Sequence, residues 1–567
     1  MIQAEIEQRL QEATLTHLPD ADRARLLVRP CADPQHGDYQ SNALMGLAKQ
    51  RKMNPRQLAE QVVQSLDVAD WCEPVEIAGP GFLNFRLKPD ALQAALRSAL
   101  KSDCPFVDPA KSPRTVVVDF SSPNVAKPMH VGHIRSTILG DTLARVLRML
   151  GHRVVTDNHI GDWGTQFGML LLGWKTELDE AALEQDPIAE LERLYKTINA
   201  DESCRDEARA ELVKLQAGDE ENLAIWQRMI ALSQVQFDHV YGRLGVTFDE
   251  TLGESFYNPH LSELTEELQE KGIAEESEGA LVVRFSGDKQ LADKPAIVRK
   301  RDGAANYTTT DLATLRYRME AWQPTDIVYV TDGRQQLHFQ QLFKIFGRWQ
   351  DAVSVKLEHV WFGSILGPDG KPFKTRSGDT VRLADLLNEA EERAFALVSE
   401  KNRDLTEDER RAIARVVGLG ALKYADLSNN RQSDYIFDWD KMLALQGNTA
   451  PYLQYAYTRV RSIFRKMDAP NFATVEFRLK APEELALAKH LMNFGQTLEM
   501  VAQDYRPNFL CNYLFELAGH FSRFYEACPV LKAEEAERNS RLAICELTAR
   551  VLRSGLDALG IEVTEVM

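Results

Sequence analysis

The segment 115–150 most constrains how this 567-residue chain can fold. It opens with TVVVDF, a short run of β-branched residues typical of a buried parallel strand. The polar loop SSPNVAKPMH follows, and a helical pattern then runs from about Gly132 to Leu150. Next, HRVVTDNHI predicts a second strand and GDWGTQFGMLLLGW another helix. This order favours an α/β fold with a doubly wound, Rossmann-like parallel sheet.

The rest of the chain divides into regions that differ in residue pattern, and a length of 567 residues predicts three or four domains. Residues 1–110 predict a small α+β domain that ends in a proline-rich linker. Residues 111–390 predict the sheet domain, with a charged, mostly helical insertion at about 175–300. A helical connector is expected at 391–445, and an all-α domain at 446–567.

Composition excludes several classes of protein. The chain is 44% hydrophobic and 27% charged, which argues against a disordered or fibrous protein. No apolar run approaches the roughly 18 residues of a membrane helix, and the polar N-terminus lacks a signal core, so we expect a cytoplasmic protein. Seven scattered cysteines without a C-x-x-C pair suit reduced thiols and argue against zinc. The net charge of −17 excludes a uniformly basic nucleic-acid coat but allows local basic patches.

The loop after the first strand carries the most chemistry. The strand ends in Asp119, and ligands of open α/β sheets bind where strands end. His130 and His133 stand at the start of the next helix, whose free N–H groups favour phosphate, and Lys127 adds a cation. Gly132 would let a ligand approach the backbone closely. The alternatives are histidines that cap or pack, and a metal site, for which no further ligands are evident.

The residues HVGH at 130–133 resemble the HIGH motif of class I aminoacyl-tRNA synthetases. The longer run SPNVAKPMHVGHIRSTILGD resembles arginyl-tRNA synthetases of the bacterial type. So do GDWGTQFG, YTTTDLA, KYADLSNNR, DYIFDWD and GNTAPYLQYAYTR, in the same order over essentially the whole chain. The resemblance implies a monomeric ligase that joins L-arginine to tRNA(Arg) through arginyl-adenylate. It implies ATP as the Mg²⁺ complex, no protein-bound metal, and a need for tRNA in the activation step.

The same resemblance implies an ATP site. His130, His133 and Lys127 take catalytic roles, together with Lys374 and Arg376 of a degraded KMSKS-like loop. That loop, GPDGKPFKTRSG at 367–378, allows two registers, one pairing Lys371 with Lys374 and one placing Arg376 second. A solvated hairpin is the alternative for this loop, and a structural turn is the alternative for GDWGTQFG. The ATP-binding residues implied are Pro123, Asn124, Val125, Ala126, Lys127, Pro128, Met129, His130, Val131, Gly132, His133, Gly161, Asp162 and Trp163.

Arginine recognition calls for carboxylates, because a guanidinium is a planar fork of donors. Tyr307 and Asp311 are four residues apart, which places both on one face of a helix start. They match the family's tyrosine and aspartate, and we expect Asp311 to bind the guanidinium unless it caps the helix. Asp119 would bind the guanidinium or the α-ammonium. The arginine-binding residues implied are Asp119, Ser122, Asn124, Tyr307, Asp311 and Gln335.

Two segments predict contacts with RNA. Tyr452, Tyr455 and Arg459 fall on one face of a helix, where aromatic rings stack on bases and arginine meets phosphate. A half-buried core helix is the alternative. By resemblance this C-terminal domain binds the anticodon region and the N-terminal domain binds the tRNA elbow. The tRNA-binding residues implied are Phe82, Asn84, Tyr452, Gln454, Tyr455 and Arg459.

Other functions stay open at this point. A HIGH-type nucleotidyl transferase that does not use tRNA would need neither terminal domain. A non-catalytic paralogue would not need His130, His133 and Lys127. A glutamyl-type synthetase would need cations where this chain has acids, and a cysteinyl-type enzyme would need a zinc-ligand cluster.

Overall fold

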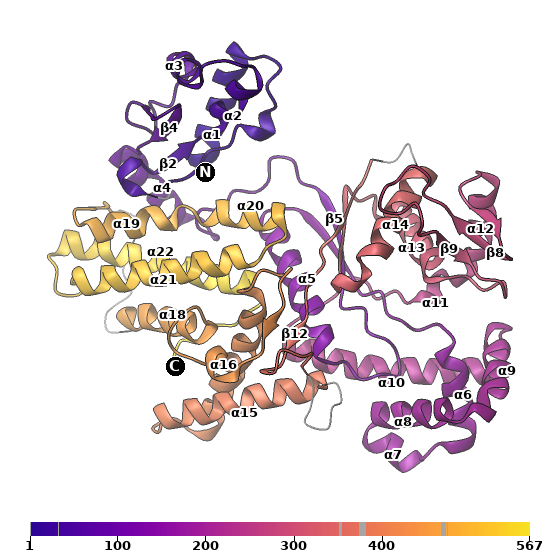
Figure 1. The fold of residues 1–567 in the computed structure, drawn as a ribbon. Coiled ribbons are helices and arrows are strands. Elements are labelled where there is room, and N and C mark those ends of the chain that lie inside the picture. Colours follow the sequence, from indigo (N-terminus) through magenta and orange to yellow (C-terminus); the bar gives the residue numbers. More distant parts are fainter. Residues whose placement is uncertain (1, 32, 351–353, 374–380, 466–471, 473–474) are drawn as a thin grey trace.

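A computed structural model gives the fold, and it describes residues 2–31, 33–350, 354–373, 381–465, 472 and 475–567. Figure 1 shows a central sheet with its helix α5, a helical region on one side and two lobes on the other. The N-terminal domain lies against the helical region, over α19 (Pro482–Leu491) and α20 (Phe494–Asp504). The central sheet therefore sits between parts of the chain that are distant in sequence.

The central sheet has four parallel strands in the order β11-β10-β5-β6. Val118 of β5 pairs in register with Val328 of β10 and Thr156 of β6. The valines of β5 are almost fully buried, as a strand covered on both faces requires. This confirms the doubly wound parallel sheet. Its elements are β5 (Thr115–Phe120), α5 (Val131–Met149), β6 (Arg153–Asp157), β10 (Asp326–Val330), α14 (Gln336–Trp349) and β11 (Lys356–His359).

Two lobes are inserted between β6 and β10. The first is helical, and comprises α6 (Gln166–Glu177), α7 (Glu180–Gln185), α8 (Pro187–Ala200), α9 (Arg205–Gln216) and α10 (Glu220–Leu244). The second contains α11 (Glu254–Tyr257), α12 (Leu261–Glu270), β7 (Glu275–Ser277), β8 (Ala280–Val283), β9 (Ala296–Arg299) and α13 (Tyr307–Trp322). The small antiparallel sheet β7-β8-β9 differs from the expected mostly helical insertion. Its strands are only three or four residues long, too short to give a clear alternating pattern.

The N-terminal domain is a four-stranded antiparallel sheet with helices, as expected for an α+β module. Its elements are α1 (Ile2–His17), β1 (Arg29–Pro30), β2 (Tyr39–Ser41), α2 (Ala43–Gln50), α3 (Pro55–Ser65), β3 (Glu76–Ala78), β4 (Phe82–Phe85) and α4 (Pro89–Lys101). Lys489 of α19 forms an ion pair with Asp38 at 2.6 Å. Gln496 of α20 donates a hydrogen bond to the carbonyl of Val28. These contacts fix the module to the C-terminal helices.

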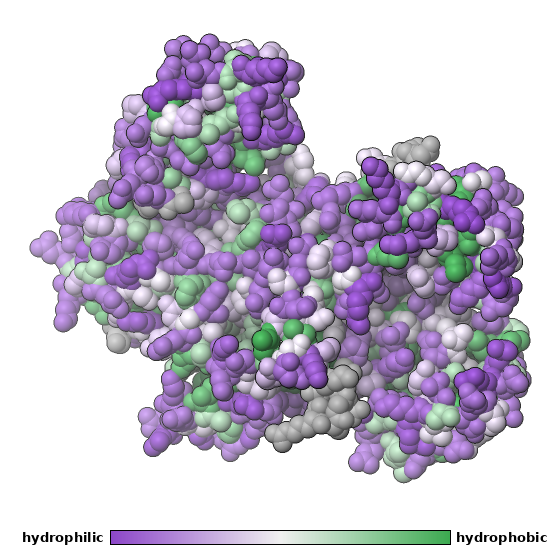
Figure 2. All heavy atoms as spheres, in the orientation of Figure 1, coloured by the Kyte–Doolittle hydropathy of each residue, from purple (hydrophilic) through white to green (hydrophobic). Residues whose placement is uncertain are grey.

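C-terminal to the sheet, the described residues form helices and one short pair of parallel strands, β12 (Ile365–Leu366) and β13 (Tyr435–Ile436). The helices are α15 (Leu383–Lys401), α16 (Glu407–Leu427), α17 (Trp439–Met442), α18 (Ala450–Phe464), α19, α20, α21 (Asn508–Ala527) and α22 (Glu535–Ala558). Within the described ranges, no helix is both long and apolar enough to cross a membrane. Figure 2 shows a mainly hydrophilic face with small, scattered apolar groups.

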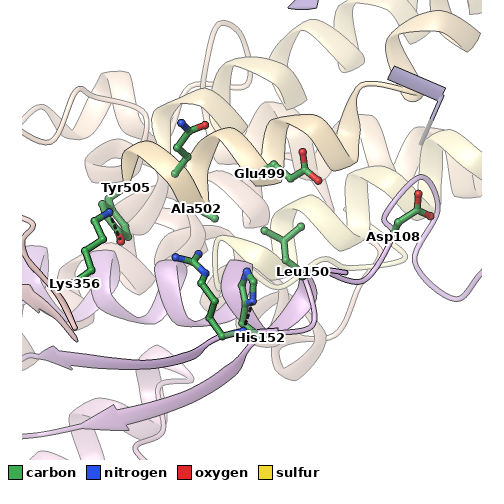
Figure 3. Close-up of a pocket in the computed structure, with 10 residues that line it drawn as sticks. Asp108, Leu150, His152, Lys356, Glu499, Ala502 and Tyr505 are labelled. Atoms are coloured by element: carbon green, nitrogen blue, oxygen red, sulfur yellow. Dashed lines mark hydrogen bonds between the residues drawn. The ribbon is translucent and has the colours of Figure 1, made fainter. Parts of the chain in front are cut away.

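A cavity of about 250 Å³ opens at the N-terminal edge of the sheet, where the linker meets α20 (Figure 3). Arg114, His152 and Lys356 stand at or just before the starts of β5, β6 and β11, and the ring of Tyr505 covers the Lys356 ammonium at 5.1 Å. Ligands of α/β sheets bind at the opposite, C-terminal edge. The functional site is therefore built from the other ends of these strands.

Candidate active site

The loop between β5 and α5 is held in a strained backbone conformation. Ser121, Ser122 and Ala126 have φ values of 73°, 49° and 62°, in a region that residues other than glycine rarely adopt. The Ser122 amide donates to Asn158 Oδ1 at 3.1 Å, and the Ala126 amide donates to Ser233 Oγ at 2.9 Å. The loop is thus fixed by β6 and by α10 before any ligand arrives.

His130 and His133 cap the start of α5 reciprocally. The Gly132 amide donates to His130 Nδ1, and the His130 amide donates to His133 Nδ1, both at 3.0 Å. Burial lowers the pKa of His133 to about 3, and burial together with the Arg334 charge lowers the pKa of His130. Both rings are therefore neutral near pH 7, and each carries its proton on Nε2 because Nδ1 accepts. The histidines therefore do cap the helix, as one of the alternatives predicted. The cap uses only their Nδ1 atoms, so neither Nε2–H group takes part in it.

The absence of a side chain at Gly132 makes room for the imidazole ring of His130. A Cβ atom at position 132 would lie 2.8 Å from Cε1 and 3.0 Å from Nδ1 of the His130 ring. We expected this glycine to make room for a ligand. The structure shows that the imidazole itself fills the direction of the missing side chain.

The chain at Val381 and Leu383, which follows the KMSKS-like segment in sequence, lies beside the histidines. The Val131 amide donates to the carbonyl of Val381, and the Leu383 amide donates to the carbonyl of Met129, both at 2.9 Å. Lys127 is exposed, with its ammonium 5.2 Å from the centre of the Tyr195 ring on α8. Lys374 and Arg376, the two predicted catalytic cations of the segment, lie outside the described residues.

The remaining residues expected around ATP shape the loop. Among them, Pro123, Val125, Ala126, Met129 and Val131 are buried, and Pro128 is half-buried. A Cβ at Gly161 would lie 2.3 Å from Asn124 Oδ1, so this glycine accommodates Asn124.

Asp162 and Trp163 hold neighbouring helices. Asp162 is buried and accepts hydrogen bonds from the Ser255 amide at 2.8 Å and the Ser255 hydroxyl at 2.6 Å. Trp163 packs edge-to-face on Trp226 of α10, with ring centres 5.6 Å apart. These contacts favour the structural-turn interpretation of this segment.

Tyr307 and Asp311 come together at the start of α13. His338 Nε2 lies 2.5 Å from Asp311 Oδ2, and the Tyr307 and His338 ring centres are 4.8 Å apart. Asn306 caps the helix by accepting from the Tyr307 amide, so Asp311 does not serve as the cap. His338 was missed in the sequence, because a single histidine on an amphipathic helix gives no functional signal.

Glu254 is a second residue that sequence reasoning missed. It begins α11, and burial with the nearby charges of Asp311 and Asp162 raises the pKa of its carboxyl to about 7. His159 is the one positive influence that opposes this shift. Among the described residues, no lysine or arginine pairs with Glu254. A half-buried carboxyl that no lysine or arginine pairs with, and whose pKa the charge of another carboxylate raises, suits a cationic ligand.

Asp119 is already engaged inside the protein. Its Oδ2 atom accepts from Arg318 at 2.5 Å, and its Oδ1 atom accepts from the Ser122 hydroxyl at 3.2 Å. Asn124 and Gln335 are exposed at the ends of β5 and β10. The structure thus gathers the predicted arginine residues at one edge of the sheet, with one oxygen of Asp119 committed to Arg318.

The predicted tRNA residues of α18 divide into two groups. Tyr455 is 46% exposed, Tyr452 packs partly on Phe515, and the Arg459 guanidinium lies 4.8 Å from the Tyr525 ring centre. Gln454 is fully buried, and its amide donates to the carbonyls of two residues outside α18. Gln454 is therefore an internal support, because its position in the helix turns it away from the exposed face.

In the N-terminal domain, Phe82 and Asn84 are two residues apart on β4, so they lie on the same face of the strand but differ in exposure. Phe82 is half-buried, and Asn84 is 3% exposed. Asn84 Oδ1 accepts from Gln40 at 2.7 Å, whereas its amide nitrogen has no protein partner among the described residues. Asn84 is thus less accessible than we expected for a base-reading residue.

Three family models match the chain. They are "tRNA synthetases class I (R), catalytic domain" over residues 95–439, "DALR anticodon binding domain" over 453–567 and "Arginyl tRNA synthetase N terminal domain" over 1–87. An "Arginine--tRNA ligase" of Chromobacterium violaceum is 50% identical and covers 99% of each chain. The protein of that name from Escherichia coli K12 is 48% identical and covers 100% of each chain.

Solved structures agree with these matches. The arginyl-tRNA synthetase of Plasmodium falciparum has a TM-score of 0.85 at 28% identity, covering 100% of this chain and 99% of its own. The Thermus thermophilus arginyl-tRNA synthetase has a TM-score of 0.83 at 26% identity, with 100% of both chains covered. The likeness thus extends over the sheet domain, both lobes and both terminal domains.

Proposed function

The chain belongs to the arginyl-tRNA synthetase family, and from that premise we propose that Glu254 and Asp311 together bind the guanidinium of the substrate arginine. The activity is the ATP-dependent ligation of L-arginine to tRNA, through the adenylate that is general for class I synthetases. What remains to be assigned is the role of each side chain in this site.

One observation carries the guanidinium assignment. Glu254 and Asp311 lie on different helices, and burial together with the charge of Asp311 raises the pKa of the Glu254 carboxyl to about 7. A guanidinium offers five donors in a plane and can serve both carboxylates at once. Its positive charge would offset the repulsion between the two carboxylates, so Glu254 would lose its proton and become negatively charged. The Tyr307 ring packs against the ring of His338, which contacts Asp311. We propose that the planar guanidinium stacks on the Tyr307 ring.

The α-ammonium and carboxylate groups of arginine bind at the C-terminal edge of the sheet. The α-ammonium binds Asp119, which keeps one oxygen directed to Ser122 rather than to Arg318. Asn124 and Gln335, both exposed at strand ends, bind the carboxylate end. This orientation directs the carboxylate of arginine towards the histidine loop, where the α-phosphate must lie for an in-line displacement.

His130 and His133 bind the phosphates of ATP, which enters as its Mg²⁺ complex. Their Nε2–H groups are fixed donors at a helix N-terminus, and Lys127 supplies a mobile cation beside them. Negative charge develops on the departing pyrophosphate, and fixed donors stabilise it without reorganisation. Lys374 or Arg376 adds a further cation from the KMSKS-like segment. Within the described ranges, no group of three or more histidine, cysteine or acidic side chains is arranged to hold a metal ion.

The terminal domains bind tRNA. Tyr452, Tyr455 and Arg459 form the anticodon-facing surface of α18 within the domain at 446–567. Phe82 and Asn84 contact the tRNA elbow from the domain at 1–110, and the connector at 391–445 links α18 to the sheet domain at 111–390. We also propose that bound tRNA is needed for arginine activation. A cytoplasmic monomer suits this role and the seven free cysteines.

ATP–pyrophosphate exchange with each of the twenty standard amino acids, with and without unfractionated tRNA, tests this function. Exchange with arginine only, and only when tRNA is present, is the expected result. Exchange with another amino acid would contradict the guanidinium site. Full exchange without tRNA would remove the tRNA requirement and leave the site intact.

A further inference from the structure

Arg318 is a fully buried cation beneath the arginine site. It lies on α13, two turns after Asp311, and is 0% exposed. Its Nη2 atom donates to Asp119 Oδ2 at 2.5 Å and to Asp157 Oδ2 at 2.8 Å, and its Nε atom donates to Asp157 at 3.1 Å. The face of the Tyr329 ring on β10 lies 5.3 Å from the guanidinium carbon. Arg318 therefore ties α13 to three strands of the sheet.

The two carboxylates need such a partner. Asp119 and Asp157 are paired in register on β5 and β6, so two acids face each other at the end of the sheet. Like charges directly opposite are unfavourable, and more so in a buried place. Burial and the charge of Asp119 raise the pKa of Asp157, while Arg318 acts in the opposite direction. No other lysine or arginine among the described residues forms an ion pair with either acid.

Two groups of acids thus lie in the site, and arginine has two cationic groups. Asp119 and Asp157 are paired in register, and the charge of Asp311 reaches Glu254 strongly enough to raise the pKa of its carboxyl. Carboxylates placed together suit a guanidinium fork. Arg318 supplies a guanidinium to Asp119 and Asp157 from within the protein. Among the described residues, no lysine or arginine forms an ion pair with Glu254 or Asp311, and Asp311 pairs with His338.

We propose that Arg318 is a positioning residue for substrate orientation: it fills the guanidinium-shaped gap between Asp119 and Asp157, holds Asp119 for the α-ammonium, and so leaves Glu254 and Asp311 to bind the substrate guanidinium. This inference rests on the proposed function, which assigns the two ends of arginine. It adds a reason why arginine binds in one direction.

Substitution of Arg318 tests the inference through pyrophosphate exchange with tRNA present. Arg318→Ala lowers kcat/KM for arginine about 100-fold and changes the KM for ATP less than about threefold, because it leaves two facing acids without their buried cation. The matched control is Arg316→Ala on the same helix, where the guanidinium pairs with Glu267 away from the site. We expect this control to stay within about twofold of the unsubstituted protein. An equal rise in both KM values would overturn the inference.

A double variant separates charge from packing. Asp157→Asn in the Arg318→Ala background removes one of the two facing charges and recovers about tenfold of the lost kcat/KM for arginine. A purely structural Arg318 predicts that the double variant is no better than the single one, and that result would also overturn the inference.

Arg318→Lys serves where alanine prevents folding, since it keeps the charge and the buried stem. A lysine side chain is shorter and lacks the planar fork that places Nη2 on both carboxylates and Nε on Asp157, so we expect the KM for arginine to rise about tenfold. An unchanged KM for arginine in this variant contradicts the inference. Asp311→Ala measured in parallel tests the proposed guanidinium site by itself, because that variant leaves the Arg318 contacts in place.

Discussion

The two halves of the proposed active site are built in opposite ways. The half that we propose binds phosphate comes from four consecutive residues, His130 to His133, whose hydrogen bonds to one another are already formed in this structure. The half that we propose binds arginine comes from separate elements, with Asp311 on α13, Glu254 on α11 and His338 on α14. Burial keeps the histidines neutral by lowering their pKa values and keeps Glu254 partly neutral by raising its pKa. The first half is preorganised by its own backbone, whereas in our proposal the second half is completed by the charge of the substrate guanidinium.

Asp311→Ala gives the largest expected effect, because it removes half of the proposed guanidinium site. We expect the KM for arginine to rise roughly 100- to 1,000-fold, as for loss of a partner to a desolvated charge. The KM for ATP should change by less than about threefold. Pyrophosphate exchange measures both. Glu320→Ala, at an exposed acid on the same helix, is the control. Equal effects on arginine and ATP would show that the halves are not separate.

His133→Asn tests the other half. It removes one fixed donor, and we expect kcat for exchange to fall about 100-fold while the KM for arginine stays within about threefold. Steady-state exchange with arginine varied at saturating ATP gives both values. A KM for arginine that rises in proportion to the loss of kcat would contradict a division of the site into two halves.

The structure also explains why the residues of one half could be predicted from the sequence and several residues of the other half could not. Residues 115–133 are contiguous, so β-branched runs, loop polarity and helix-start chemistry all mark the same short segment. Tyr307 and Asp311 are found for the same reason, since four residues of helix bring them together. Glu254 and His338 are single residues in other helices, and only the tertiary fold places them near Asp311. Arg318 shares α13 with Asp311, but only the tertiary fold brings Asp119 and Asp157 to it. Gln454 shows the reverse case, because its polar side chain is directed inward to bind main-chain carbonyls.

Gly132→Ala sharpens the comparison within the phosphate half. The added Cβ would lie 2.8 Å from His130 Cε1, so the imidazole must move. We expect kcat for exchange to fall about tenfold with the KM for arginine unchanged, as for a displaced catalytic group. Gly347→Ala on α14 is the matched control, because its Cβ meets nothing within 4 Å. Equal activity of the two variants would show that the His130 position is not critical.

Glu254→Gln tests the arginine half through stability rather than activity. The pKa of Glu254 is about 7 in the folded chain against 4.5 for a free side chain, so the folded state binds the proton more tightly. Native Glu254 therefore loses stabilisation as the pH rises from 4.5 to 7. Relative to the unsubstituted protein, Glu254→Gln should gain about 1–3 kcal/mol in free energy of unfolding between pH 5 and pH 8. Urea unfolding at both pH values measures this. A difference that does not change with pH would contradict the raised pKa.

Calorimetric titration with arginine at pH 6.5, in two buffers of different ionisation enthalpy, tests the central claim most directly. If the substrate guanidinium completes the Glu254–Asp311 pair, Glu254 must lose its proton on binding. With a pKa of about 7, roughly 0.7 proton per arginine should be released, and Glu254→Gln should release none. Binding without proton release, or the same release from Glu254→Gln, would contradict the account.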